Sequence, residues 1–144
     1  GLESLHVRMK RHCENGLAMA RFLSESEHVS HVTYCDLPGD KYHEVAKKYL
    51  PNGSCGVVSF TVKGGRKAAE EFMKHLRLIA IETHVADARS CCLHPASSTH
   101  RQMTDAELAA CGVSPDLVRL SCGIENADDL IADVKQALEA AHKA

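Results

Sequence analysis

Apolar and polar residues alternate along segment 117–125, and this alternation is typical of a half-buried strand. Val118, Leu120 and Cys122 fall on one face of such a strand, whereas Leu117, Arg119 and Ser121 fall on the other. Asn126 follows the strand and is a suitable N-cap for a helix that continues to the end of the chain. The pattern therefore predicts a strand that holds one guanidinium on a rigid element, followed by a C-terminal helix.

The rest of the pattern predicts an α/β (α+β) fold in which strands and helices alternate along the chain. We expect further helices near residues 2–24, 40–50, 65–76 and 104–111, and further strands near residues 29–34, 56–62, 78–82 and 90–94. Thr104 and Glu107 have the spacing of a capping box, which marks the start of the fourth of these helices. Together these elements predict a sheet of four or five strands with helices packed mainly on one face.

Two helices have apolar residues at a spacing that predicts which side faces the core. In the opening helix these residues are Leu2, Leu5, Met9, Cys13, Leu17 and Ala20. In the short second helix, which Asp40 is placed to cap, they are Tyr42, Val45, Ala46, Tyr49 and Leu50. We expect both stripes to be buried.

Composition narrows the possible functions. The 144 residues suffice for one domain with a real core, and the net charge of -2 arises from intermixed acidic and basic residues, so we expect no nucleic-acid or membrane partner. Seven cysteines without a C-x-x-C pair predict reduced thiols in a cytoplasmic protein. The opening helix begins without an initiator Met or a clear cap, so we expect the chain to belong to a longer protein.

Several residues could carry chemistry, each with a plainer alternative. Arg119 can grip a carboxylate through two parallel hydrogen bonds, but it can equally be a solvated surface charge. Cys91, Cys92, His94 and His100 lie close together in the sequence, yet their spacing fits no structural zinc pattern, and a Cys–His nucleophile needs a third orienting group. We expect His94 to bond backbone groups in a turn, and Gly64 and Gly65 to form a tight turn rather than a phosphate cradle.

Two segments in this order resemble the C-terminal signature of the pyridoxal-phosphate enzymes of cysteine and methionine metabolism. These segments are 94–100 (HPASSTH) and 117–125 (LVRLSCGIE), with the Thr104 capping box between them. Further matching segments, 1–9, 46–51, 63–66 and 112–116, resemble the O-acetylhomoserine sulfhydrylase branch of the family. The resemblance extends over essentially the whole chain.

The resemblance implies a substrate-binding role for specific residues. The family residue that matches Arg119 binds the substrate α-carboxylate, and the loop that matches residues 83–87 closes over the same group. In this loop His84 stands where the family has another polar residue, and Ala86 stands where it has glycine. We therefore take Arg119, His84 and Thr83 as the candidate substrate-binding residues, although His84 can also be a solvated loop residue.

The resemblance also implies an organisation for the parent protein. Residues 1–28 match the helix that links the cofactor domain to the C-terminal small domain, and residues 29–144 match that small domain, whose sheet is mostly antiparallel. The family's lysine that binds the cofactor lies in a Ser/Thr-rich stretch that this chain lacks, so we expect no catalytic residue, no metal and no bound cofactor in the chain alone.

For the full-length parent the resemblance implies a homo-oligomeric, pyridoxal-phosphate-dependent transferase or lyase that makes homocysteine or methionine from O-acetylhomoserine and sulfide or a thiol. The alternatives are methionine γ-lyase or cystathionine γ-synthase of the same family, a free-standing small-molecule-binding module, or an oligomerisation domain.

Overall fold

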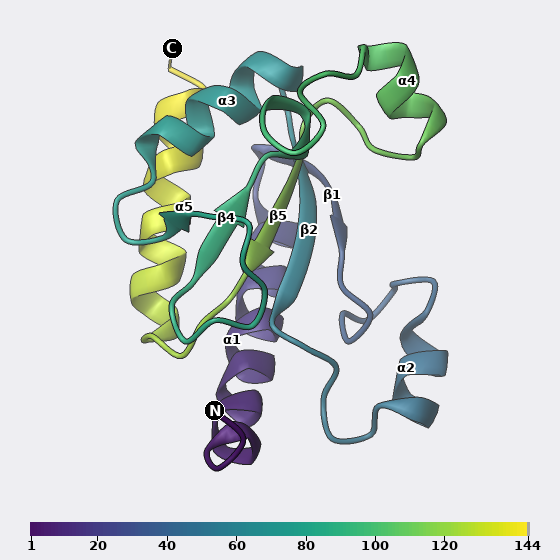
Figure 1. The fold of residues 1–144 in the computed structure, drawn as a ribbon, viewed down its shortest axis with the longest axis vertical. Coiled ribbons are helices and arrows are strands. Elements are labelled where there is room, and N and C mark those ends of the chain that lie inside the picture. Colours follow the sequence, from purple (N-terminus) through teal and green to yellow (C-terminus); the bar gives the residue numbers. More distant parts are fainter. Residues whose placement is uncertain (144) are drawn as a thin grey trace.

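The computed structural model describes residues 1–143 as one five-stranded sheet with helices around it (Figure 1). The elements, in chain order, are α1 (Leu5–Glu25), β1 (Val29–Thr33), α2 (His43–Tyr49), β2 (Val57–Val62), α3 (Gly65–His75), β3 (Ala80–Ile81), β4 (Cys91–Leu93), a 3-10 turn (Pro95–Ser97), α4 (Asp105–Ala110), β5 (Leu117–Ser121) and α5 (Ala127–Ala141). Each α-helix and strand lies within a few residues of the segment where the sequence pattern predicts it.

The sheet has the strand order β1-β2-β5-β4-β3, so β5 is its central strand. Neighbouring strands are antiparallel except β3 and β4, which run parallel. The prediction of a mostly antiparallel sheet of four or five strands is confirmed. Because β5 has a neighbour on each side, its side chains are held more rigidly than those of an edge strand.

Helices α1, α3 and α5 pack against one face of the sheet. Alternate residues of the central strands point into this core, including Val58, Phe60 and Val62 of β2 and Val118 and Leu120 of β5, all at most 1% exposed. Phe60 meets Phe72 of α3 edge to face, with ring centroids 5.7 Å apart. On the opposite sheet face Leu117 and Arg119 are half-buried, as the alternation along 117–125 predicts, whereas Ser121 and the β4 residues Cys91 and Leu93 are buried.

The expected inner face of α1 is wrong over the first half of the helix. Leu2 and Leu5 are 82% and 39% exposed, and the helix instead buries His12, Asn15, Gly16, Met19, Ala20 and Leu23. The His12 ring (Nδ1) lies 2.6 Å from the carbonyl of Cys122, and the Asn15 amide donates to the carbonyls of Gly123 and Glu125. The helix thus docks partly through His12 and Asn15, polar residues that bond backbone atoms and that an apolar pattern cannot reveal, whereas its later residues Met19, Ala20 and Leu23 join the apolar core.

The expected inner face of α2 is also wrong, because only Ala46 of that helix is buried. Tyr42, Val45, Tyr49 and Leu50 are between 44% and 68% exposed. Figure 1 shows why: α2 stands beside β1 and β2, connected to each by a loop, and does not lie over the sheet. None of the helices within residues 1–143 combines the length and the apolar character needed to cross a bilayer.

Candidate functional site

Arg119 lies on the central strand β5, on the sheet face opposite to α1, α3 and α5. Ser59 of β2 and Leu93 of β4 are its partners on the two neighbouring strands. Strand alternation places Ser121 on the same face, two residues further along. The strand therefore presents a fixed guanidinium and a hydroxyl side by side.

The guanidinium of Arg119 is only partly satisfied by the protein. Its Nη2 donates to the carbonyl of Thr83 at 2.8 Å and to the carbonyl of His84 at 3.3 Å. Its Nε is buried and has no hydrogen-bond acceptor among residues 1–143. A buried donor without an acceptor costs about 1–3 kcal/mol. This N–H is enclosed by the protein's own atoms, so the oxygen of an anionic ligand reaches it only when the surrounding side chains or the loop above it move.

The loop between β3 and β4 carries the other two candidate residues. The backbone carbonyls of Thr83 and His84 bond Arg119, and the backbone N–H of Ala86 donates to Ser121 Oγ at 3.0 Å. The structure thus brings Thr83, His84 and Arg119 together, as the sequence analysis expects of a common site. Ser121 is a further residue of this site: the alternation along the strand places it on the Arg119 face, but nothing in the sequence marks it as a binding residue.

The His84 imidazole points along its own loop toward Asp87. The two side chains form a pair with Nδ1 and Oδ2 3.5 Å apart, and they are 62% and 41% exposed. The backbone N–H of Arg89 and, to a lesser degree, His84 hold the pKa of Asp87 below its ordinary value. The loop therefore keeps a carboxylate of its own in the charged state beside His84.

Segment 94–100 is a structural turn, which confirms the expectation for His94. This imidazole is 1% exposed, and its Nδ1 lies 2.8 Å from Ser97 Oγ while its Nε2 lies 2.7 Å from the carbonyl of Pro115. Ser98 Oγ donates to the carbonyl of His94 at 2.6 Å. Since both ring nitrogens are engaged, His94 has no free position for a metal or a nucleophile.

The cysteines offer no activated nucleophile near this turn. Cys92 is 1% exposed, and burial strongly raises the pKa of its thiol, the opposite of what a reactive thiolate needs. Cys91 also has a raised pKa because of burial. Within residues 1–143 no three His, Cys, Asp or Glu side chains are grouped so as to hold a metal ion.

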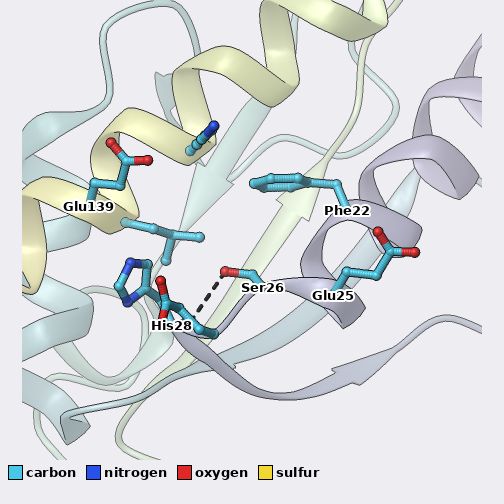
Figure 2. A pocket seen from close by; sticks show the side chains of 8 residues that line it. Phe22, Glu25, Ser26, His28 and Glu139 are labelled. Atoms are coloured by element: carbon cyan, nitrogen blue, oxygen red, sulfur yellow. Dashed lines mark hydrogen bonds between the residues drawn. The ribbon is translucent and has the colours of Figure 1, made fainter.

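A separate hollow of 360 Å³ lies between the C-terminal ends of α1 and α5. Figure 2 shows Phe22 reaching toward it from α1, with Glu25 and Glu139 on opposite sides and a hydrogen bond from His28 to Ser26 at its edge. None of its charged residues, Glu25, Glu27, Lys135 and Glu139, is buried. This hollow is a solvated groove without a fixed binding group.

Comparison with known proteins identifies the family. The model of the Cys/Met metabolism PLP-dependent enzymes matches residues 1–139. The chain belongs to this family. It is 44% identical over 138 residues to O-acetyl-L-homoserine sulfhydrylase 1 of Thermus thermophilus, covering 96% of this chain and 33% of that protein. It is 40% identical over 142 residues to cystathionine gamma-lyase of Rattus norvegicus, covering 99% and 35% respectively.

A solved family member has the same fold. The crystal structure of a putative O-acetylhomoserine (thiol)-lyase from Campylobacter jejuni, which contains N'-pyridoxyl-lysine-5'-monophosphate, superimposes with a TM-score of 0.89 at 38% identity. The match covers 96% of this chain and 33% of that one. The chain thus spans about a third of the length of the family members it matches.

The family cofactor, pyridoxal phosphate, does not fit the residues of this chain. A cofactor lysine acts from an enclosed site, where it is held against the cofactor's reactive carbon. Every lysine within residues 1–143 is solvent-exposed. Next to the Gly64–Gly65 turn, Arg66 is engaged by the Ala96 carbonyl and by an ion pair with Asp105. Residues 1–143 therefore supply neither the lysine site nor a free phosphate cradle.

Proposed function

We propose that the chain is the C-terminal, substrate-binding part of a pyridoxal-phosphate-dependent O-acetylhomoserine sulfhydrylase. In this proposal residues 29–144 form the small domain, and residues 1–28 link it to a cofactor domain. The length comparison with the relatives supports this division. The N-terminal part of α1 supports it too, because it extends beyond the sheet (Figure 1), and Val7 in this helix and Leu2 just before it are 64% and 82% exposed. Such apolar side chains are suited to contact another part of the protein.

The observation that carries the proposal is the buried Nε of Arg119, which has no acceptor among residues 1–143. A substrate α-carboxylate supplies two oxygens in one plane, which matches the planar donors of a guanidinium. Arg119 binds this carboxylate, and because β5 is the central strand the substrate amine is held in a fixed direction. Thr83 and His84 line the same site from the loop above Arg119.

The reaction proposed for the full-length protein replaces the acetate of O-acetylhomoserine with sulfide or a small thiol, giving homocysteine or methionine. Pyridoxal phosphate supplies the electron sink for this chemistry, and residues outside this chain hold it. This chain's contribution is to bind and orient the substrate. We therefore expect the 144-residue chain alone to be inactive, and the full-length protein to act as a homo-oligomer.

Substitution of Arg119 by Lys in the full-length protein tests the proposal. A lysine ammonium is a point charge that cannot form two parallel hydrogen bonds, so we expect the KM for O-acetylhomoserine to rise at least about tenfold. Arg101→Lys, an exposed arginine outside the site, serves as the matched control and should leave KM unchanged. An unchanged KM in Arg119→Lys would remove Arg119 from the substrate site.

Product analysis separates this activity from those of the other relatives. Because the chain is also 40% identical to a cystathionine gamma-lyase, a lyase is the second candidate. Homocysteine formed from O-acetylhomoserine and sulfide supports the sulfhydrylase, thiol released from methionine supports a γ-lyase, and cystathionine formed from cysteine supports a γ-synthase. An absorption titration with pyridoxal phosphate that shows no cofactor band in the full-length protein would favour a free-standing binding module or an oligomerisation domain.

A further inference from the structure

The loop that carries Thr83 and His84 is held in place by hydrogen bonds rather than by apolar packing. All of its residues between Glu82 and Arg89 are exposed except Asp87, which is half-buried. Few buried apolar contacts and solvent-exposed backbone are features of segments that open easily. The position of the loop therefore depends on the few polar contacts that tie it to the sheet.

Ser121 provides the tie at the middle of the loop. Its Oγ accepts the backbone N–H of Ala86 at 3.0 Å, and its side chain is buried at 2% exposure. Ala86 has a φ of 58°, in the left-handed region that is unfavourable for alanine. A strained residue persists when its surroundings determine its conformation. Here Ser121 holds the N–H of Ala86 itself, and two residues further on the carbonyl of Ala88 accepts the backbone N–H of Ile124 at 3.0 Å.

The two ends of the loop have different anchors. At the first end, Arg119 holds the carbonyls of Thr83 and His84. At the other end, Glu125 accepts the backbone N–H of Ser90 at 2.7 Å and its hydroxyl at 2.9 Å. The end at Ser90 and the carbonyl of His84 are thus fixed independently of Ser121, whereas the backbone N–H of Ala86, one peptide further along, is held by Ser121.

Resting on the proposed function, we propose that Ser121 is a positioning residue for the substrate carboxylate. Its hydroxyl fixes the Ala86 peptide and thereby sets where Thr83 and His84 stand relative to Arg119. Ser121 does not touch the substrate in this arrangement. Its loss should therefore weaken substrate binding without slowing the chemical step.

The test uses the full-length protein with its cofactor, in the variants Ser121→Ala and Ser121→Thr. We expect Ser121→Ala to raise the KM for O-acetylhomoserine about fivefold to tenfold, the worth of one hydrogen bond, with kcat within about twofold of wild type. Ser121→Thr retains the hydroxyl and should restore KM. The matched control is Ser30→Ala on the edge strand β1. It also removes a side-chain hydrogen bond, the 2.6 Å contact with Thr61 of β2, and should leave KM unchanged.

Hydrogen–deuterium exchange gives a readout that does not depend on activity. In Ser121→Ala the peptide covering residues 82–90 should exchange about five to ten times faster, while β5 itself exchanges as in wild type. If Ser121→Ala does not give folded protein, Ser121→Cys, which keeps the size of the side chain with a weaker acceptor, serves for the same comparison.

The possible outcomes separate this inference from the proposed function. A wild-type KM in Ser121→Ala, or a faster-exchanging loop without any change in KM, overturns the positioning role. If these results come with a raised KM in Arg119→Lys, the carboxylate site itself stands. If Arg119→Lys also binds substrate normally, the proposed function fails and the inference fails with it.

Discussion

Asp133 is a buried carboxylate that ties α5 to the segment after α3. It is 6% exposed, and its two oxygens accept the backbone N–H groups of Arg77, Leu78 and Ile79, each at 2.9 Å. These three donors lie just beyond the C-terminal end of α3, where the helix can no longer satisfy the backbone. One side chain thus replaces the hydrogen bonds that the turn cannot make for itself.

We predict that Asp133→Asn lowers the free energy of unfolding by about 2 kcal/mol. The new amide NH2 group cannot accept a hydrogen bond, so at least one of the three N–H groups loses its partner, and the remaining bonds lose their charge assistance. Urea unfolding measures the change, with Asp129→Asn as the control because Asp129 is exposed on the same helix. Equal losses in the two variants would show that the three N–H contacts contribute nothing.

For single residues, the sequence predicts an inward-facing side chain correctly only where that side chain lies in an apolar interior. Alternation placed Arg119 on the open face correctly, since its strand neighbours are apolar or small. Asp133 and Asn15 are buried because they bond backbone groups from distant segments, and no local pattern contains those partners. Ser121 is the intermediate case: its face was predictable, but its partner, the Ala86 peptide, was not.

Helix α1 docks on the sheet at Gly16, where the two backbones come very close. A Cβ at this position would lie 2.8 Å from the carbonyl oxygen of Cys55 and 3.1 Å from the Cα of Gly56. It would also lie 3.0 Å from the hydroxyl of Tyr34, which donates to the Cys55 carbonyl. The closeness of this approach explains why a glycine stands in the interior of a helix of 21 residues.

We predict that Gly16→Ala destabilises the fold by about 1–3 kcal/mol, the usual cost of forcing an extra methyl into a packed interface. The sign of the change in the free energy of unfolding decides the matter, because alanine in an ordinary helix interior is about 1 kcal/mol more favourable than glycine and would stabilise the protein. Thermal or urea unfolding measures the change, and Arg21→Ala on the exposed side of α1 should change stability by less than about 0.5 kcal/mol. A more stable Gly16→Ala variant would contradict the close approach of α1.

Elements were more predictable than the faces they bury. Hydrophobic periodicity, β-branched and aromatic composition, and turn and capping residues together located every α-helix and strand, and the Thr104 capping box starts α4 as expected. Hydrophobic periodicity predicted the wrong buried face for α1 and α2, because it assumes that an apolar stripe packs against the core of the same chain. Tyr49 and Val45 of α2 are 68% and 53% exposed, so their apolar character has no counterpart within residues 1–143.

The seven cysteines of the chain are all free thiols, and they differ mainly in how deeply they are buried. Cys92 and Cys122 belong to the main core, whereas Cys111 is exposed on the loop after α4. Burial raises the pKa of the Cys122 thiol from its ordinary value of 9.0 to about 12 and raises that of Cys92 strongly as well. The core therefore keeps these two thiols protonated at a pH where the unfolded chain would ionise them.

This difference in thiol pKa between the folded and the unfolded state makes the stability of the whole molecule depend on pH in the alkaline range. Above about pH 9 the unfolded state loses thiol protons that the folded state retains, so the free energy of unfolding falls as the pH rises from about 9 toward 12.

Between pH 8 and about pH 10.5 we expect Cys122 alone to contribute roughly 1–2 kcal/mol of this loss. Urea unfolding at the two pH values measures it, and Cys122→Ala should show a loss smaller by that amount, whatever its stability at pH 8. Cys111→Ser, whose thiol is exposed in both states, should lose as much as wild type. Equal losses in Cys122→Ala and wild type would mean that the Cys122 thiol ionises as readily in the folded core as in the unfolded chain.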